Sequence, residues 1–371
     1  MIIVKALQAE TLGALQRVLG VVERRHTVPI LANVLIRKTG RTIEMTTTDL
    51  ELQIRTRAEL GGDAGDFATT LNARKLADIL RAMPPDQTVS LGASQKRLTL
   101  QGGRSRFTLQ TLPADEFPLV REAADYGLAF ELPQAVLKSL IEQVGFAMAV
   151  HDIRYFLNGV LFIAEGTRLT LVATDGNRLA LAQATVDAEL PRREVILPRK
   201  TVLELQRLLH DGTAGGDMVA IRFAAAQASF GFSGIELVSK LIEGRFPDYQ
   251  RVIPTGNRHR VTLGRAPLLA GLQRVAILTT EKFRGVRLNF APGLLRIASS
   301  NAQHEEADEE IEIDYAGDTI EIGFNIGYLL DGLGNSSAEM VTLDLQNAQS
   351  SVLFTFADRA GFKYVVSPMR L

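Results

Sequence analysis

Apolar and polar positions alternate along three separate stretches of the chain. Residues 156–179 read FLNGVLFIAEGTRLTLVATDGNRL, with alternation on both sides of Glu165-Gly166-Thr167. This pattern predicts two strands joined by a turn. Residues 31–54 (LANVLIRKTGRTIEMTTTDLELQI) and 283–304 (FRGVRLNFAPGLLRIASSNAQH) repeat the strand, the Gly-containing turn, the second strand and the polar end. The chain therefore contains three copies of one β-rich segment.

The spacing of the copies defines the domain organisation. Asp49, Asp175 and Asn301 occupy matching places, and each lies 126 residues from the next. This interval is about a third of the 371-residue chain. We therefore predict three domains, at residues 1–122, 126–250 and 253–371, with linkers near 118–125 and 247–254, where Pro and charged residues interrupt the pattern.

Each copy also contains two segments with the apolar spacing of a helix. In the first segment these apolar positions are Leu12, Leu15, Leu19 and Val22; Leu137, Leu140, Ile141 and Val144; and Leu268, Leu269, Leu272 and Val275. In the second they are Leu76, Ile79, Leu80 and Met83; Val202, Leu203, Leu205 and Leu209; and Leu329, Leu330 and Leu333. Paired strands close each copy, at 88–91 and 98–111, at 218–223 and 229–239, and at 340–345 and 351–356, with 363–367 added. The predicted class is α+β, with two helices and an antiparallel sheet per domain.

Composition is that of a soluble globular protein. The chain is 46% hydrophobic and 22% charged, so each domain can bury an ordinary core. No apolar run approaches the roughly 18 residues of a membrane span, and the amino terminus MIIVKALQAE does not have the pattern of a signal peptide. We expect a cytoplasmic protein.

Residues suited to catalysis or metal binding are sparse. The chain has no cysteine, which excludes disulfides and thiolate chemistry. Its histidines, His26, His151, His210, His259 and His304, have no metal-binding spacing, and no phosphate-binding glycine loop is present. Asp49, Asp175 and Asn301 fit Asx turns that close a hairpin. We therefore expect no catalytic residue, no metal and no cofactor.

Several motifs carry a family resemblance: PILANVL (29–35), DIRYFLNGVLF (152–162), VATDGNRLA (172–180), EGRFPDYQRV (243–252), EKFRGVRL (281–288) and VVSPMRL (365–371). Together with the triplication, they resemble the bacterial DNA polymerase III β-subunit, the replicative DNA sliding clamp, over the whole chain. The resemblance implies the DNA clamp fold and a ring-shaped homodimer that encircles duplex DNA without sequence specificity. It also implies partners that carry a short clamp-binding peptide: the DNA polymerase III catalytic subunit, the clamp loader and other proteins. The ring would tether the polymerase and make synthesis processive.

Domain size supports six domains in the ring. A domain of this length has a diameter of roughly 35 Å. Rings of three, four and six touching discs of that size leave holes on the order of 5, 14 and 35 Å. Duplex DNA is roughly 20 Å across, so only six domains, and therefore two chains, leave room for it.

The resemblance also implies which residues contact DNA. A clamp needs weak contacts to phosphates, because such contacts carry no base information. The candidates are Arg25, Arg74, His151, Tyr155, Phe156 and Arg199, and Lys200 is added because of its charge. Phe156 departs from the family pattern, in which this position is often Tyr.

A peptide groove between the second and third domains is implied in the same way. Its matching positions are Arg154, Leu157, Thr174, Gly176, Asn177, Arg178, Leu179, Pro247, Arg251, Val252, Ser351, Val365, Val366, Ser367, Pro368, Met369 and Arg370. An apolar floor with a Met lip suits Leu or Phe anchors of a short peptide. Asn177 and Ser367 depart from the family, which often has His and Met there, and Ser367 shortens one wall.

Charge distribution suggests how two chains meet. Residues 1–125 hold 17 Lys/Arg against 14 Asp/Glu, whereas residues 252–371 hold 11 against 14. We expect a head-to-tail contact between Lys75, Arg97, Arg104 and Arg106 of one chain and Glu305, Glu306, Glu309 and Glu310 of the other. The resemblance places Phe107 and Leu109 against Ile277 and Leu278 at its centre.

Two other interpretations stay open at this point. The chain would be a metal-dependent enzyme of nucleic-acid processing if Asp49 and Asp175 were catalytic carboxylates. It would be a triplicated binding scaffold if it did not encircle DNA at all.

Overall fold

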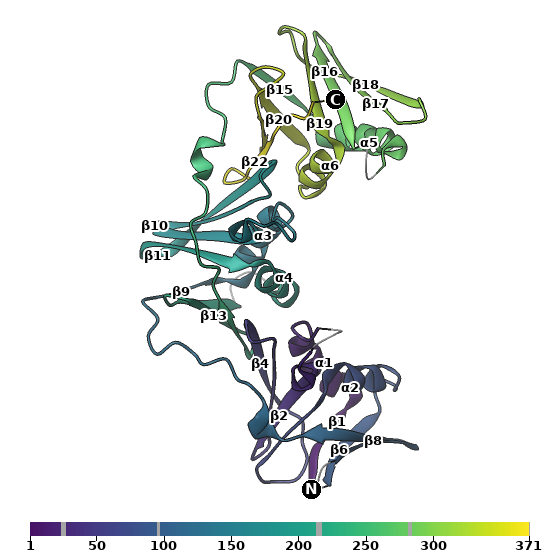
Figure 1. The fold of residues 1–371 in the computed structure, drawn as a ribbon, viewed down its shortest axis with the longest axis vertical. Helices are drawn as coiled ribbons and strands as arrows, with labels where there is room; N and C mark the ends of the chain where they lie inside the picture. The colour runs from purple at the N-terminus through teal and green to yellow at the C-terminus, as the bar shows by residue number, and fades with distance from the viewer. Residues whose placement is uncertain (24–26, 95–96, 213–216, 281–283, 371) are drawn as a thin grey trace. The chain divides into compact units, whose positions relative to one another are not determined.

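The same order of elements recurs three times along the chain (Figure 1). We describe a computed structural model that covers residues 1–23, 27–94, 97–212, 217–280 and 284–370. The first copy comprises β1 (Ile2–Leu7), α1 (Gln8–Leu19), β2 (Asn33–Thr39), β3 (Thr42–Thr48), β4 (Leu52–Glu59), β5 (Phe67–Asn72), α2 (Ala73–Arg81), β6 (Thr88–Ser94), β7 (Arg97–Gly102) and β8 (Ser105–Leu112). The second comprises β9 (Leu128–Pro133), α3 (Gln134–Gly145), β10 (Gly159–Thr174), β11 (Arg178–Pro198), α4 (Arg199–Leu208), β12 (Met218–Phe223), β13 (Gln227–Phe232) and β14 (Ile235–Lys240). The third comprises β15 (His259–Gly264), α5 (Arg265–Val275), β16 (Gly285–Ala291), β17 (Leu294–Ser300), β18 (Glu306–Glu312), β19 (Ile320–Asn325), α6 (Ile326–Gly334), β20 (Met340–Leu345), β21 (Val352–Phe356) and β22 (Lys363–Val366).

The chain forms two compact units, and the second copy is shared between them. Unit 1 comprises Met1–Leu137 and Lys200–Leu241, and unit 2 comprises Lys138–Arg199 and Ile242–Leu371. The fold class predicted from the repeat, α+β with three tandem copies, is confirmed by the recurring order of helices and antiparallel strands. The bounds of the three domains stay a prediction.

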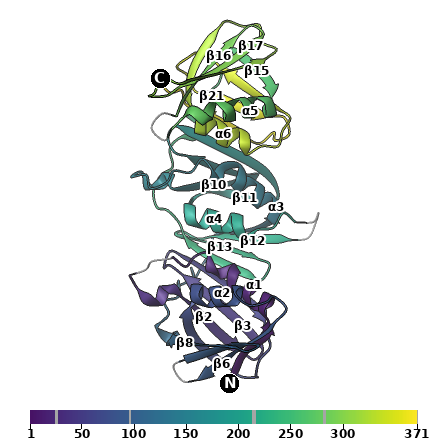
Figure 2. The same cartoon turned by 90° about the vertical axis from the view of Figure 1, so that its right-hand side faces the viewer.

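Unit 1 is built on one twelve-stranded sheet, in the order β1-β6-β7-β8-β5-β2-β3-β4-β14-β13-β12-β9. The first and second copies join where β4 pairs antiparallel with β14, with Thr56 opposite Ile235 and Leu52 opposite Ser239. Helices α1 and α2 pack side by side against strands of the first copy (Figure 2). Leu15 and Leu19 of α1 and Leu76 and Leu80 of α2 are buried, as the helical spacing indicated. Leu12 and Ile79 are half-buried, and Val22 and Met83 lie beyond the ends of the helices.

Unit 2 contains a six-stranded sheet, β10-β11-β22-β21-β20-β15, and a four-stranded sheet, β18-β17-β16-β19. Here the second and third copies join where β11 pairs antiparallel with β22, with Arg178 opposite Val366 and Leu181 opposite Lys363. Helix α5 packs on β17 and β18, and α6 lies beside it. In both units, successive copies are therefore joined by an antiparallel pair of strands.

Local sequence explains where two of the helices begin. The Asn72 side chain accepts a hydrogen bond from the backbone N–H of Lys75 at the start of α2. The Asn325 side chain accepts one from Gly327 at the start of α6. Each Asn follows a strand and satisfies an N–H that has no partner within the helix.

Three predicted strand boundaries were wrong. The expected strand 98–111 is two strands, β7 and β8, because Gly103 has φ +55° and reverses the chain. The expected strand 229–239 is likewise split into β13 and β14, by Ser233 and Gly234 with φ +49° and +72°. Where two strands and a turn were expected in 156–179, β10 is a single element. Its register with β11 shifts on both sides of Gly166, whose φ is +58°.

None of the helices in the described part of the chain combines the length and apolar character needed to cross a bilayer.

A tight helix position in unit 2 gives a stability prediction. Gly332 of α6 lies against the ring of Tyr364, and a Cβ at this position would collide with that ring. Gly332→Ala should lower the free energy of unfolding by about 1–3 kcal/mol, because Tyr364 is fully buried and has no room to shift. Denaturant unfolding of purified protein measures the change.

Gly334→Ala, in the same helix, is the matched control. No atom lies within 4 Å of a Cβ at Gly334, so this variant should be neutral or slightly stabilising. Equal unfolding midpoints for the two variants would contradict the packing at Gly332.

Candidate functional site

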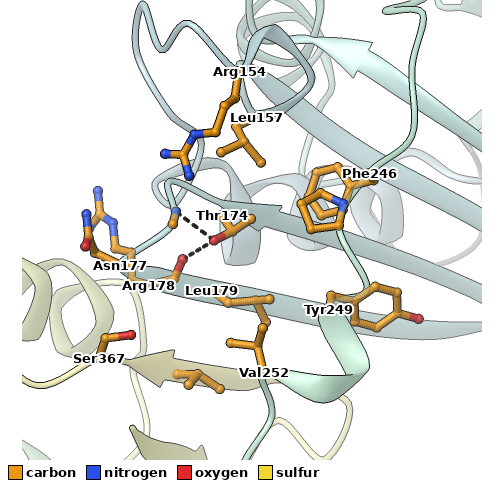
Figure 3. Close-up of a pocket in the computed structure, with 13 residues that line it drawn as sticks. Arg154, Leu157, Thr174, Asn177, Arg178, Leu179, Phe246, Tyr249, Val252 and Ser367 are labelled. Atoms are coloured by element: carbon orange, nitrogen blue, oxygen red, sulfur yellow. Dashed lines mark hydrogen bonds between the residues drawn. The ribbon is translucent and has the colours of Figure 1, made fainter.

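A pocket of about 170 Å³ opens in unit 2 beside the β11·β22 joint (Figure 3). It is lined by Arg154, Leu157, Thr174, Gly176, Asn177, Arg178, Leu179, Phe246, Pro247, Tyr249, Val252, Val365 and Ser367. These residues come from four segments: the loop before β10, the turn between β10 and β11, residues 246–252, and the end of β22 with the tail that follows it.

The pocket floor is part of the hydrophobic core. Leu157, Leu179 and Val365 are each 1% exposed and belong to one buried cluster with Phe246. Leu179 lies opposite Val365 in the β11·β22 ladder, so the joint between copies fixes both side chains. The floor is therefore rigid and apolar, which suits an apolar anchor side chain of a ligand.

One wall is the turn between β10 and β11. Asp175 Oδ1 accepts hydrogen bonds from the backbone N–H of Asn177 (2.9 Å) and Arg178 (3.1 Å). Thr174 Oγ1 donates to the Arg178 carbonyl at 2.6 Å and accepts from Gly176 N–H at 3.1 Å (Figure 3). Gly176 has φ +94°, a conformation that favours glycine.

The Asx turn predicted at the end of each hairpin is confirmed in all three copies. Asp49 Oδ1 accepts from the N–H of Glu51 and Leu52, as Asp175 does in the second copy. Asn301 Oδ1 accepts from Gln303 and Glu305. The matching place of Gly176 is Leu50 in the first copy, where a non-glycine residue has φ +79°.

Arg178 connects the pocket with helix α6. Its side chain is 10% exposed and forms ion pairs with Asp175 (3.0 Å) and Asp331 (2.5 Å). It also donates to the Phe146 carbonyl at 2.8 Å, and its guanidinium lies 4.6 Å from the Tyr328 ring centre. Five donors in a fixed plane allow one arginine to hold all these groups together. The Arg178 side chain therefore stabilises both the wall of the pocket and the packing of α6.

Arg154, at the rim of the pocket, is fixed by its neighbour. Its guanidinium donates to both oxygens of Asp152, at 3.0 and 2.7 Å, and its backbone N–H donates to Asp152 at 2.8 Å. These hydrogen bonds lower the pKa of Asp152 from 3.8 to about 2. The fork holds Arg154 in place, with its terminal nitrogens beside Gly176, while half of its side chain stays exposed.

Most of the predicted groove residues line the pocket. Those that do not are Arg251, Ser351, Val366, Pro368, Met369 and Arg370. Met369 and Arg370 line a second hollow, and the Met369 N–H donates to the Gly323 carbonyl at 2.7 Å. The expected Met lip of the groove stays a prediction. Phe246 and Tyr249 were missed, although both lie within the motif EGRFPDYQRV.

Two of the predicted DNA contacts already have partners at the end of α1. Lys200 donates to the Val21 carbonyl at 2.9 Å and forms ion pairs with Asp49 (2.5 Å) and Glu23 (3.2 Å). Arg74 donates to the Val22 carbonyl. Both carbonyls lie just beyond Leu19, the last residue of α1, where the helix dipole favours a cation. Both side chains thus stabilise unit 1, and their contact with DNA stays a prediction.

The other DNA candidates differ in exposure. Tyr155 is 57% exposed and meets Phe156 edge to face, with 5.8 Å between ring centres, while Phe156 packs on the pocket core. His151 is exposed and has φ +55°. Arg199 is half-buried, and burial together with Arg178 lowers the pKa of its guanidinium. Arg25 lies outside the described residues.

The predicted dimer residues lie on edge strands and beside them. Strand β18 is an edge of the four-stranded sheet, and β8 pairs with β5 only through Leu112 and Thr111. The basic candidates Lys75, Arg97, Arg104 and Arg106 are all exposed. Phe107 is 38% and Ile277 78% exposed, unlike the buried Leu109 and the half-buried Leu278.

The acidic run is partly engaged within the chain. Glu309 pairs with Arg274 at 2.5 Å, and this hydrogen bond lowers the pKa of Glu309. Glu305 accepts a hydrogen bond from Asn301 at 2.5 Å. Glu306 and Glu310 are exposed. These two are therefore the better candidates for pairing with a second chain.

The two carboxylates that a metal-dependent enzyme would need make structural contacts instead. Asp49 holds its own turn and the Lys200 ammonium, and Asp175 holds its turn and Arg178. Among the described residues no group of three or more His, Asp or Glu side chains is placed to hold a metal ion.

Comparisons with known proteins agree with this architecture. The chain is 44% identical to the beta sliding clamp of Pseudomonas aeruginosa over 97% of both chains. It is 41% identical to the beta sliding clamp of Escherichia coli strain K12, again over 97% of both. A crystal structure of the Pseudomonas aeruginosa clamp bound to griselimycin superposes with a TM-score of 0.94, at 42% identity and full coverage of both chains. The fold is thus that of a DNA sliding clamp.

Three family models match in succession. The N-terminal, central and C-terminal domains of the DNA polymerase III beta subunit match residues 5–121, 131–248 and 250–370. The chain therefore belongs to the DNA polymerase III beta subunit family. Its function is that of a sliding clamp, and the interpretation as a metal-dependent enzyme is not supported.

The Arg154–Asp152 fork gives a pH prediction. Because the pKa of Asp152 is lower in the folded than in the unfolded chain, the fork contributes stability above about pH 4 and loses it as the pH falls towards 2. Arg154→Met should return the pKa of Asp152 towards 3.8, as measured by NMR titration of the carboxyl carbon. Arg251→Met, which removes a separate exposed pair with Asp248, is the control and should leave Asp152 unchanged. A titration still centred near pH 2 in Arg154→Met would contradict the fork.

Proposed function

We propose that two copies of this chain close head to tail into a ring around duplex DNA, and that the pocket of each copy captures a short peptide of a partner protein. The partners we assign are the DNA polymerase III catalytic subunit, the clamp loader and other proteins with a clamp-binding peptide. The ring would tether the polymerase without catalysing a reaction itself. We place this activity in the cytoplasm.

The proposal of peptide capture rests on the pocket. Its floor of Leu157, Leu179 and Val365 is buried and preformed, and polar groups stand at its rim. A preformed apolar floor lowers the cost of ordering a ligand, and rim groups fix its direction. A similar clamp structure from Pseudomonas aeruginosa contains griselimycin, which supports a ligand-binding role for this class of protein.

DNA contact is proposed for the exposed members of the predicted set, His151 and Tyr155, and for Phe156 next to Tyr155. It is also proposed for Arg199, whose backbone N–H donates to the Asn158 carbonyl at 2.9 Å. Sliding requires that no single contact be strong, and these residues offer few charges. We retain Arg74 and Lys200 in the proposal because their charges would add positive electrostatic potential near the phosphates.

The third joint of the ring is proposed by analogy with the two joints within the chain. In those joints β4 pairs with β14, and β11 pairs with β22. Strand β18 follows the Asx turn of the third copy as β4 and β11 follow the turns of theirs, and β8 closes the first copy as β14 closes the second. We therefore expect β18 of one chain to pair antiparallel with β8 of the next.

Charge reversal tests the same interface by its electrostatics. Changing Glu305, Glu306, Glu309 and Glu310 to Lys should weaken the dimer at least tenfold, because four like charges would then face the basic edge of the next chain. Sedimentation at low and high salt measures the affinity. Because Glu309 also holds Arg274 within the chain, Glu306→Lys with Glu310→Lys separates the interface effect from a folding defect. Dimer affinity unaltered in both variants would refute the head-to-tail contact.

A charge placed in the pocket tests peptide capture. Val252 lines the pocket and is 44% exposed, so Val252→Glu should fold normally. It should lower the affinity for a peptide with Leu and Phe anchors at least tenfold, because the carboxylate would be desolvated by the ligand. Met340→Glu, at a position 42% exposed outside the pocket, is the control in the same calorimetric titration. Undiminished binding by Val252→Glu would remove the pocket from the peptide site.

A further inference from the structure

A second and larger hollow lies in unit 2, on the four-stranded sheet. Its volume is about 590 Å³, and its lining comprises Gly285, Arg287, Arg296, Ala298, Ser299, Ser300, Glu306, Ala307, Asp308, Met369 and Arg370. We call it the β16–β18 basin. It shares no lining residue with the pocket described above.

The basin occupies the sheet face that points away from α5. A Cβ at Gly271 of α5 would meet Ile297, Glu309 and Ile311, so these side chains face the helix. Alternate residues on a strand point to opposite faces, so Arg296, Ala298 and Asp308 point the other way. Gly285 and Ala298 are small, which leaves the middle of this face hollow and its rim of long charged side chains raised.

The rim carries arginines with unused binding capacity. Arg296 pairs with Asp308 at 2.7 Å, and this hydrogen bond lowers the pKa of Asp308. Arg287 is exposed and Arg370 ends the described tail, and among the described residues neither guanidinium has a hydrogen bond or ion pair. The planar guanidinium matches a carboxylate in a two-point contact. Asp308 is already paired with Arg296. Of the other charged lining residues, Arg287 and Arg370 are positive and Glu306 is negative, so the lining of the basin favours an acidic group.

The tail connects the basin with the peptide pocket. Ser367 lines the pocket, and its N–H donates to the Asn177 carbonyl at 2.9 Å. Met369 lines the basin, and its N–H donates to Gly323 at 2.7 Å. Two residues span at most about 7 Å of extended chain. A peptide that leaves the pocket along this tail therefore reaches the basin within a few residues.

We infer that the β16–β18 basin is a second docking surface for the partner whose peptide occupies the pocket, and that it takes an acidic segment flanking the anchor residues. The inference rests on the proposed peptide capture. The pocket supplies the apolar anchor site, and the basin selects partners by the charge of the flanking residues. Partners that share the same anchors would then differ in affinity.

Matched peptides test this inference. One peptide carries the Leu and Phe anchors alone, and others add three Glu or three Gln residues at the amino or at the carboxyl end. For the unaltered protein, one Glu-extended peptide should bind more tightly than its Gln counterpart, by about two- to fivefold for each ion pair formed. The gain should fall at high salt, because exposed pairs are screened.

Protein variants locate the effect. Arg287→Glu should abolish the gain of the Glu extension while leaving the anchor peptide, the dimer and the unfolding midpoint unchanged; Arg287→Gln should remove part of it. Arg168→Glu, an exposed arginine of β10 outside both hollows, is the control and should retain the gain.

The outcomes separate the two proposals. Equal affinity of the Glu and Gln peptides, or a gain that survives Arg287→Glu, overturns the basin and leaves peptide capture standing. Failure of the anchor peptide itself to bind overturns peptide capture, and the basin with it.

Discussion

The structure depends on hydrogen-bonded ladders that carry a sheet from one copy of the domain into the next. An unpaired strand edge exposes a row of backbone donors and acceptors, and it invites pairing with another strand. In this chain β4 is paired by β14 and β11 by β22, so both junctions between copies are continuous sheets. In the third copy the matching strand, β18, is an edge of its sheet, and most of β8 lies beyond its short pairing with β5, so these two strands offer a further pair of edges. The proposed dimer satisfies them with the same device, which explains how a triplicated chain closes with a second copy of itself.

The pocket proposed for peptide capture exists because one of these ladders is rigid. Leu179 and Val365 face each other across the β11·β22 joint, and both belong to the core beneath the pocket. Arg178 adds a polar clamp, since Asp175 and Asp331 lie on opposite sides of the joint and share its guanidinium. The first junction has a different chemistry at the matching place: Lys200 holds Asp49 there, and Leu50 stands where the second copy has Gly176. One scaffold element thus serves as architecture in each copy and, in the second, also forms part of the proposed recognition surface.

The sequence predicts features that depend on local chemistry and repetition. The 126-residue interval predicts three copies, and Asp49, Asp175 and Asn301 form the Asx turns that their residue types favour. The boundaries of β7 and β8 were missed, because Gly103 was not recognised as a turn residue within an alternating stretch. Features that depend on contacts between distant residues could not be predicted from the sequence. Nothing in residues 365–371 indicates that the Met369 N–H donates to Gly323 of β19. Likewise, the sequence marks Lys200 as a cation but does not reveal that the end of α1 already holds it.

The most direct measurement of the central claim is topological. The protein is loaded onto a nicked circular duplex by the clamp loader of the same cell, and the complex is isolated by gel filtration. The circle is then cut once, and the amount of protein that remains bound is measured. A sliding ring should stay with the closed circle and leave the linear duplex by sliding off its ends. Retention that is the same before and after cutting, or no retention on the circle, would contradict the account.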